Sequence, residues 1–233
     1  LDARGCFQLP SMDEIGSIMG PFTVVDSTFA TPVGQQPLAH GVDLVVHSAT
    51  KGIAGHNDAT IGVVAGEREL VDAIWGYGVL HGAMASPFDA LNALRGVRTL
   101  AVRTAHQAAT AQHLAEWLTE HPAVAVVHYP GLGSHPQHDL AKRQMRQFGT
   151  VLAFDLAEGH EAVRRLIDRI ELARPATSLG GPETLLCHPQ TTTHASLTPD
   201  EQAACGVTDG LVRLTVGLED AGDLVADLTR ALG

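Results

Sequence analysis

Basic side chains, cysteines and long hydrophobic runs are all scarce in this sequence of 233 residues. With 15 Lys and Arg against 26 Asp and Glu, the net charge is -11, so we do not expect nucleic acid, which requires a basic surface, as a partner. No apolar run reaches the roughly 18 residues of a membrane span. The three cysteines are scattered, and no signal-peptide layout opens the chain, so we expect a protein without disulfides in the cytoplasm.

Short valine-rich segments in the first half predict buried strands. They are FTVVD at 22–26, DLVVH at 43–47 and IGVVA at 61–65. Continuous apolar runs of this kind are typical of strands that are covered on both faces. The connection over 27–42 is too long for a hairpin and long enough for a crossover with a short helix. We therefore expect the first two strands to be parallel.

The remaining pattern predicts helices and a second α/β unit. A surface helix is expected at 67–75 and a long helical region from about 87 to 120, where apolar residues recur at helical spacing. We place a domain boundary inside that region, which gives domains 1–110 and 111–233. The second domain is expected to contain strands at 124–129, 150–156 and 211–217, helices near 139–147, 160–170 and after 220, and a loop at 176–194.

Polar side chains follow two of the predicted strands. Asp26 ends the first, and the stretch HSATKG places Ser48, Thr50 and Lys51 directly after the second. Ligands gather at the carboxyl ends of parallel strands. A lysine there can form a Schiff base with the aldehyde of pyridoxal 5'-phosphate (PLP), and a carboxylate can stabilise the protonated ring nitrogen. By position alone, Lys51 is more often a solvated loop residue, and Asp26 a turn residue.

Four longer stretches follow one another in order. The first runs from VVDSTF through HSATKG to IGVV, and the second is GAMASPFDALNALRGVRTLAVR. The third is SLGGPETLLCHPQTTTH, and the fourth is GVTDGLVRLTVGLEDAGDL. Together they resemble the Cys/Met-metabolism family of PLP-dependent enzymes. The resemblance implies an α/β fold of PLP fold type I, like that of aspartate aminotransferase. Residues 1–110 would be a partial large domain with a mostly parallel sheet, and 111–233 a smaller α/β domain.

The resemblance also implies how the cofactor, PLP, is held. Lys51 would attach the cofactor and act as the catalytic base. Asp26 would pair with the pyridinium nitrogen, while the hydroxyls of Ser48 and Thr50 would bind the phosphate. These roles agree with the chemistry of each residue type, because a carboxylate favours a nearby positive charge and hydroxyls can donate to an anion.

Two further residues are implied to bind the substrate carboxylate. They are Ser178 and Arg213, and a guanidinium group can bind a carboxylate through two parallel hydrogen bonds. Without the resemblance, a surface cation on an edge strand stays open as an alternative for Arg213, and Ser178 is a turn residue before two glycines.

No metal site is expected. Cys187, His188 and His194 lie close together in CHPQTTTH, but nothing nearby completes the ligand set that zinc requires. The glycines of GIAGHNDATIG form no dinucleotide-binding fingerprint.

One residue bears on the choice of substrate. In family members that use cystathionine, the residue before the substrate-loop serine is typically glutamate, which can pair with the distal ammonium group. Thr177 occupies that position here. We therefore expect α,γ-elimination of L-methionine to methanethiol, ammonia and 2-oxobutanoate. A cystathionine γ-lyase or γ-synthase is the alternative within the family, and a catalytically silent relative is the alternative outside catalysis.

Family members also have an N-terminal part before the first of these strands, which normally supplies a phosphate loop, a stacking aromatic ring and a tyrosine acid. None of these is recognisable in residues 1–20. We therefore expect that the sequence holds only part of the natural chain. The resemblance further implies a small sulfur amino acid as substrate and a homo-oligomer, because family sites are completed by a second subunit.

Overall fold

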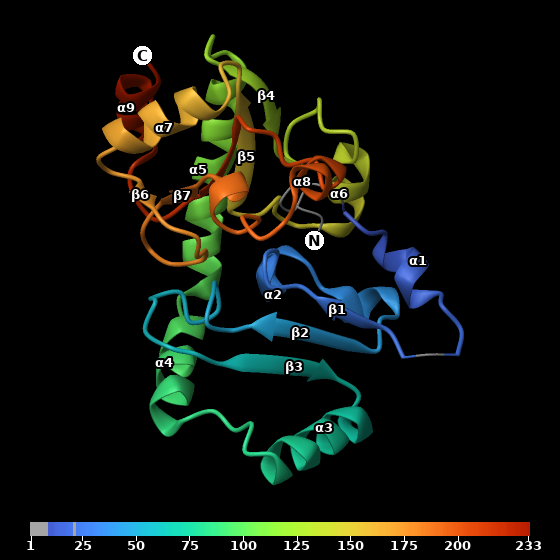
Figure 1. The fold of residues 1–233 in the computed structure, drawn as a ribbon. Coiled ribbons are helices and arrows are strands. Elements are labelled where there is room, and N and C mark those ends of the chain that lie inside the picture. The colour runs from blue at the N-terminus through green and yellow to red at the C-terminus, as the bar shows by residue number, and fades with distance from the viewer. Residues whose placement is uncertain (1–8, 21) are drawn as a thin grey trace.

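The computed structural model describes residues 9–20 and 22–233. The strand predicted at 22–26 therefore falls within the described residues. A three-stranded sheet in the first half has the order β1-β2-β3. Its strands are β1 (Val24–Asp26), β2 (Leu44–Ser48) and β3 (Gly62–Gly66). Figure 1 shows this sheet below the second half of the chain, with α5 joining the two.

The first two strands are parallel, as their connection predicts. Val24 pairs with Leu44, and the crossover between the strands contains α2 (Thr31–Gly34) and the short 3-10 helix η1 (Pro37–His40). β3 is antiparallel to β2, so the sheet is mixed rather than mostly parallel. The physical reason is the segment between them, which is a compact run of turns without a crossover helix and therefore reverses the chain.

Three helices follow the first sheet. They are α3 (Arg68–Leu80), α4 (Pro87–Val97) and α5 (Leu100–Thr119). The helical region predicted over 87–120 is thus two helices, which separate at Arg98 and Thr99. The carbonyl oxygen of Gly96 accepts hydrogen bonds from the Thr99 hydroxyl at 3.2 Å and from Arg103 at 2.9 Å, which ends α4 with side-chain donors.

The second sheet has the order β4-β5-β8-β7-β6. The pairings of β4 with β5, β5 with β8 and β8 with β7 are antiparallel, and only β7 with β6 is parallel. The bounds are β4 (Val124–His128), β5 (Val151–Leu156), β6 (Arg174–Pro175), β7 (Leu185–Cys187) and β8 (Leu211–Thr215). The region 176–194, predicted as a loop, therefore contains a buried strand, because its apolar LLC run pairs along β8.

Helices complete the second half of the molecule. α7 (His160–Arg169) and α9 (Ala221–Leu232) pack against each other, and α5 packs against β4, β5 and α9. Their apolar faces and the sheet form the largest core cluster, which includes Leu114, Phe154 and Leu214. The smaller helices are α1 (Met12–Gly16), α6 (His138–Gln144), α8 (Pro199–Ala204) and the 3-10 helix η2 (Pro189–Thr191).

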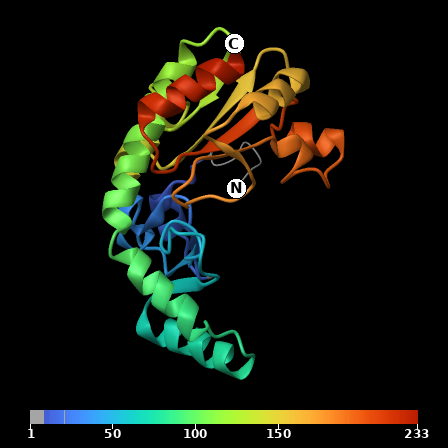
Figure 2. The same ribbon diagram turned by 90° about the vertical axis from the view of Figure 1, so that its left-hand side faces the viewer.

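α5 spans both halves of the molecule. Near its start it contacts α2 and α4, and further along it contacts β4, β5 and α9. Figure 2 shows α4 and α5 along one side, with both sheets on the same side of them. The domain boundary proposed near residue 110 therefore falls within one continuous helix. In the described residues, no helix has the length and apolar character needed to cross a membrane.

Candidate cofactor and substrate site

Asp26 and Ser48 end two neighbouring parallel strands at the same edge of the first sheet. Asp26 lies opposite Val46 in the register of β1 and β2. Thr28 ties the two strand ends together, because its hydroxyl accepts the Ser48 N–H at 2.8 Å and its own N–H donates to Asp26 Oδ1 at 2.9 Å. The Asp26 side of the edge is exposed to solvent. The sheet topology thus brings the predicted carboxylate and hydroxyl to one edge.

Lys51 lies in the turn directly after β2, where its N–H donates to Ser48 O at 3.0 Å. The residue is half-buried, and its Nζ donates to Ser178 Oγ at 3.0 Å. No carboxylate of the described residues forms an ion pair with this amine. A half-buried lysine that is bonded to a neutral hydroxyl retains an amine available for chemistry.

Arg213 joins Lys51 and Ser178 in the same cluster. Its Nη2 donates to Ser178 O at 3.2 Å and to Thr177 O. β8, which carries it, lies between β5 and β7, so the alternative of a cation on an edge strand is wrong. Within the described chain, no carboxylate pairs with Arg213, which leaves its charge available for an anion.

The hydroxyl of Thr50 is partly engaged by the fold. Its Oγ1 accepts the Ile61 N–H at 2.9 Å and lies 3.4 Å from Ile61 O, which makes the second bond weak. Because a hydroxyl can accept one hydrogen bond and donate another, Thr50 can still donate to a phosphate oxygen. The predicted phosphate role is therefore compatible with the structural one.

The loop after Ser178 approaches the Lys51 backbone very closely. Gly180 has a φ of +81°, and a Cβ at this position would lie 2.5 Å from Gly52 N and 2.8 Å from Lys51 C. Only glycine fits, both for its conformation and for its contacts. The Lys51–Ser178 hydrogen bond therefore depends on a glycine two residues after the serine.

We expect Gly180→Ala in the full-length protein to lower catalytic efficiency at least about tenfold, because the methyl group would push the loop away from Lys51. Its backbone strain should also cost about 1–3 kcal/mol of stability. Gly133→Ala is the matched control, since no atom lies within 4 Å of a Cβ there and its φ is not in the left-handed region. Steady-state kinetics and thermal unfolding check both effects, and equal behaviour of the two variants would contradict the expectation.

Two neighbouring groups define the electrostatics. Burial lowers the pKa of His47, while the Asp26 carboxylate and the Ser27 backbone act in the opposite direction, so the imidazole is neutral at neutral pH. Burial raises the pKa of Cys187, although the charge of Arg213, its partner across β7 and β8, and a hydrogen bond from Thr192 oppose this. The thiol beside the site is therefore protonated and a poor nucleophile.

A cavity of about 610 Å³ opens beside Thr50 and Ser178. Its wall carries three carboxylates, those of Asp58, Asp89 and Glu183. The Asp89 carboxylate accepts bonds from the Thr60 N–H and the Ser86 hydroxyl, and Glu183 accepts one from Asn57 at 2.7 Å, so both are partly satisfied. The remaining lining residues are Asn57, Ala59, Thr60, Arg174, Pro175, Ala176 and Leu185.

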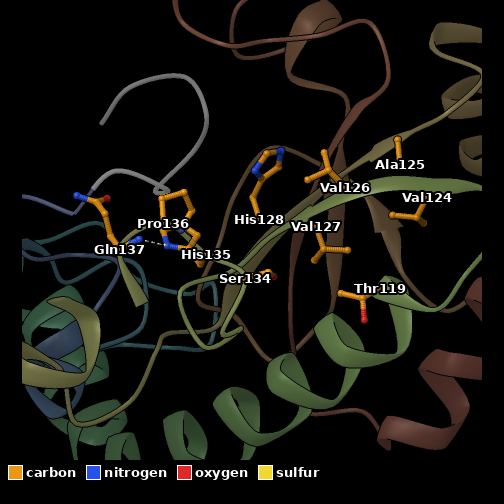
Figure 3. A pocket seen from close by; sticks show the side chains of 10 residues that line it. All are labelled: Thr119, Val124, Ala125, Val126, Val127, His128, Ser134, His135, Pro136 and Gln137. Carbon is orange, nitrogen blue, oxygen red and sulfur yellow. Dashed lines mark hydrogen bonds between the residues drawn. The ribbon is translucent and has the colours of Figure 1, made fainter. Parts of the chain in front are cut away.

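Another cavity, of about 690 Å³, lies away from this cluster (Figure 3). It is lined by the end of α5, by β4 and by the segment 134–137, and it includes none of the predicted site residues. His128 on its wall forms a 2.8 Å contact with the Asp155 carboxylate. Because none of the predicted site residues lines this cavity, we do not assign the predicted chemistry to it.

His188, one of the three residues weighed as zinc ligands, has protein partners at both ring nitrogens. His188 uses both ring nitrogens, Nδ1 with the Thr191 hydroxyl at 3.0 Å and Nε2 with Asp209 O at 3.1 Å. Across residues 9–20 and 22–233, no group of three or more His, Cys, Asp and Glu side chains could hold a metal ion.

The sequence pattern did not single out three residues that hold the site together, namely Thr28, Arg103 and Gln107. Arg103 is 6% exposed, and it donates to Gly52 O at 3.0 Å and Ile53 O at 3.2 Å, below the turn that carries Lys51. Burial lowers the pKa of its guanidinium group. The sequence did contain a signal for Arg103 and Gln107. They are four residues apart among small apolar residues, so they share one face of the helix.

The chain is similar in sequence to known proteins of one family. The sequence model described as Cys/Met metabolism PLP-dependent enzyme matches residues 7–233. An L-methionine gamma-lyase of Pseudomonas putida is 49% identical over 215 residues, which are 91% of this chain and 54% of that protein. An O-succinylhomoserine sulfhydrylase of Pseudomonas aeruginosa is 43% identical and covers 96% of this chain and 56% of its own length.

Solved structures give the same result for the fold. A cystathionine gamma synthase from Xanthomonas oryzae pv. oryzae superposes with a TM-score of 0.93 at 42% identity, over 97% of this chain and 59% of that one. The predicted α/β fold of PLP fold type I is therefore confirmed. The chain spans about half the length of the curated relatives that it matches.

Proposed function

This chain belongs to the Cys/Met metabolism family of PLP-dependent enzymes, and we propose that the complete protein is a lyase that acts on L-methionine. The reaction would convert methionine and water into methanethiol, ammonia and 2-oxobutanoate. The observation that carries the proposal is the cluster in which Lys51 Nζ donates to Ser178 Oγ while Arg213 holds the carbonyls of the same loop. An amine and a guanidinium, neither paired with a described carboxylate, are thus placed together.

The residues fit the cofactor that the family implies. An unpaired amine can bond to the PLP aldehyde, and Lys51 provides it. Asp26 has one carboxylate oxygen bonded to Thr28, and its exposed side chain can pair with a protonated ring nitrogen. Ser48 and Thr50 would hold the phosphate from the neighbouring strand end and turn.

The chain's own residues would then act on the substrate as follows. Bound PLP supplies an electron sink for negative charge at the substrate Cα. Arg213 would bind the substrate carboxylate, and Ser178 would help to orient it. Lys51 would remove the Cα proton and help to move a proton from Cβ as the thiolate leaves. Asp26 would keep the ring nitrogen charged throughout.

The preference for methionine rests on Thr177. Its side chain is uncharged and exposed, and its carbonyl is held by Arg213. A threonine cannot pair with an ammonium group as a carboxylate can, so this position gives a substrate with a distal charge no advantage. Methionine has no distal charge and ends in an apolar thioether.

A second candidate is cleavage of cystathionine, and the cavity beside Thr50 and Ser178 favours it. The carboxylates of Asp58, Asp89 and Glu183 on its wall could attract the distal ammonium group of that substrate. Because Asp89 and Glu183 already accept hydrogen bonds, we rank this candidate below methionine.

The test is a comparison of substrates with the full-length protein. The PLP-loaded protein is incubated separately with L-methionine, L-cystathionine and L-cysteine, and the thiol and keto acid formed from each are measured. We expect methanethiol and 2-oxobutanoate from methionine at the highest kcat/KM. A higher kcat/KM for cystathionine would favour the second candidate, and no product from any substrate would favour the catalytically silent relative.

We also propose a homo-oligomer, a dimer or a tetramer, as the resemblance implies, and a cytoplasmic location, which the few and scattered cysteines favour. Large apolar side chains on α3 and α4 are exposed, including Trp75 at 61% and Phe88 at 79%. Apolar faces of this kind are normally covered in a soluble protein. Light scattering on the full-length protein gives the mass, and a monomer would contradict the oligomer.

A further inference from the structure

α5 carries another buried polar residue, Gln107, one turn after Arg103. Gln107 is 1% exposed, and its Nε2 donates to Gly181 O at 2.9 Å and to Val216 O at 3.0 Å. Both acceptors are backbone carbonyls from other parts of the chain, 74 and 109 residues away in sequence. A buried amide that satisfies two such carbonyls fixes their distance from each other.

Each of the two carbonyls belongs to a residue three positions after one of the predicted substrate-binding residues. Gly181 comes three residues after Ser178, and Val216 comes three residues after Arg213. The segment between Ser178 and Gly181 contains Gly180, which lies very close to the backbone of Lys51 and Gly52. A single amide group therefore holds the loop of Ser178 and the strand of Arg213 against one helix.

The same helix also holds the other side of the site. Arg103, one turn earlier on α5, donates to the carbonyls of Gly52 and Ile53, directly after Lys51. Arg103 and Gln107 thus connect three separate segments to one rigid element. Residues on helices and strands position functional groups more accurately than loop contacts alone.

We propose that Gln107 is a positioning residue, which sets the Ser178 loop and Arg213 at the spacing needed to bind an amino-acid carboxylate beside Lys51. The inference rests on the proposed function, because it assigns Arg213 to the substrate. Gln107 does not touch the reacting atoms and acts only through the two carbonyls. The role requires the amide nitrogen, since a carboxylate oxygen or an apolar group cannot donate to a carbonyl.

The test compares Gln107→Met with Gln112→Met in the full-length protein. Methionine keeps the length of the side chain and removes the donors. Gln112 lies on the same helix, but its Nε2 donates to Glu116 at 2.8 Å and to Gly131 O at 3.3 Å, away from the site. The control therefore removes the same amide from α5 without touching the Ser178 loop.

Three measurements are made on each variant. In Gln107→Met we expect KM for the amino acid to rise roughly tenfold while kcat changes much less, because uniform binding is lost. Affinity for PLP, measured by absorbance titration, should remain within about twofold of the wild type, since the cofactor residues lie on other segments. Hydrogen exchange in the apo protein should be roughly tenfold faster in peptides covering 178–184, and unchanged there in Gln112→Met.

The outcomes separate the possible roles. A parallel loss of PLP affinity, kcat and thermal stability in Gln107→Met would show a general structural role and overturn the proposal, as would an unchanged KM with unchanged exchange. Hydrogen exchange can be measured whether or not the protein is catalytically active. If the wild type proves to be inactive, the proposed function fails, while exchange over 178–184 still decides whether Gln107 holds the loop.

Discussion

Replacement of Lys51 by alanine in the full-length protein is expected to lower the rate of elimination by at least about 10³-fold. General base catalysis alone typically contributes roughly 10²–10⁴-fold, and the variant also loses the covalent link to the cofactor. The Nζ of Lys51 lies 3.0 Å from Ser178 Oγ and has no described carboxylate as partner, so no ion pair accounts for its position. The rate of 2-oxobutanoate formation and the visible absorbance with added PLP measure both losses.

The sequence supplies its own control for this variant. Lys51 and Lys142 are the two lysines of the chain, and Lys142 is exposed on α6. Lys142→Ala should retain the activity and the visible band of the wild type. A Lys51→Ala protein that kept normal activity, or a Lys142→Ala protein that lost it, would remove the basis for the proposed site.

The second large effect is expected from Asp26→Asn. Asparagine keeps the shape and the oxygen that accepts the Thr28 N–H, but it cannot stabilise a positive charge on the ring nitrogen. A neighbouring carboxylate shifts the pKa of a partner by about 1–3 units, and each unit is a factor of ten. We therefore expect kcat to fall by roughly 10–10³-fold with little change in thermal stability.

The charge-matched control is Asp139→Asn, at an exposed position on α6. Its kcat should equal that of the wild type, which separates a local effect of Asp26 from a change in net charge. The pH dependence of the cofactor absorbance gives a second readout, because the ring-nitrogen charge should be lost at lower pH in Asp26→Asn. An unaltered kcat and pH profile would place Asp26 outside the cofactor site.

Much of the first sheet could be predicted because its signals are local. The valine-rich runs, the connection over 27–42 and the polar residues after each strand together predicted parallel strands with Asp26 and Ser48 at one edge. The antiparallel direction of β3 could not be predicted from its composition. It depends on whether the intervening segment folds as turns or as a crossover helix, and the expectation of a mostly parallel sheet came from the resemblance.

The contacts that complete the site are long-range, and sequence patterns do not report them. Lys51 and Ser178 are 127 residues apart, and only the four ordered stretches that resemble a known family suggested that they meet. Gln107 was missed although it follows Arg103 by four residues on one face of α5, because this spacing alone does not distinguish a buried amide from a solvated one. The short strand β7 was missed because three apolar residues between glycine and proline segments are too few for a periodic signal.

The most direct test of the account is chemical attachment of the cofactor. The full-length protein is loaded with PLP, reduced with borohydride, digested and mapped by mass spectrometry. We expect the cofactor on the peptide that contains Lys51, and on no peptide that contains Lys142. Cofactor attached at any other lysine, or absent from the reduced protein, would contradict it.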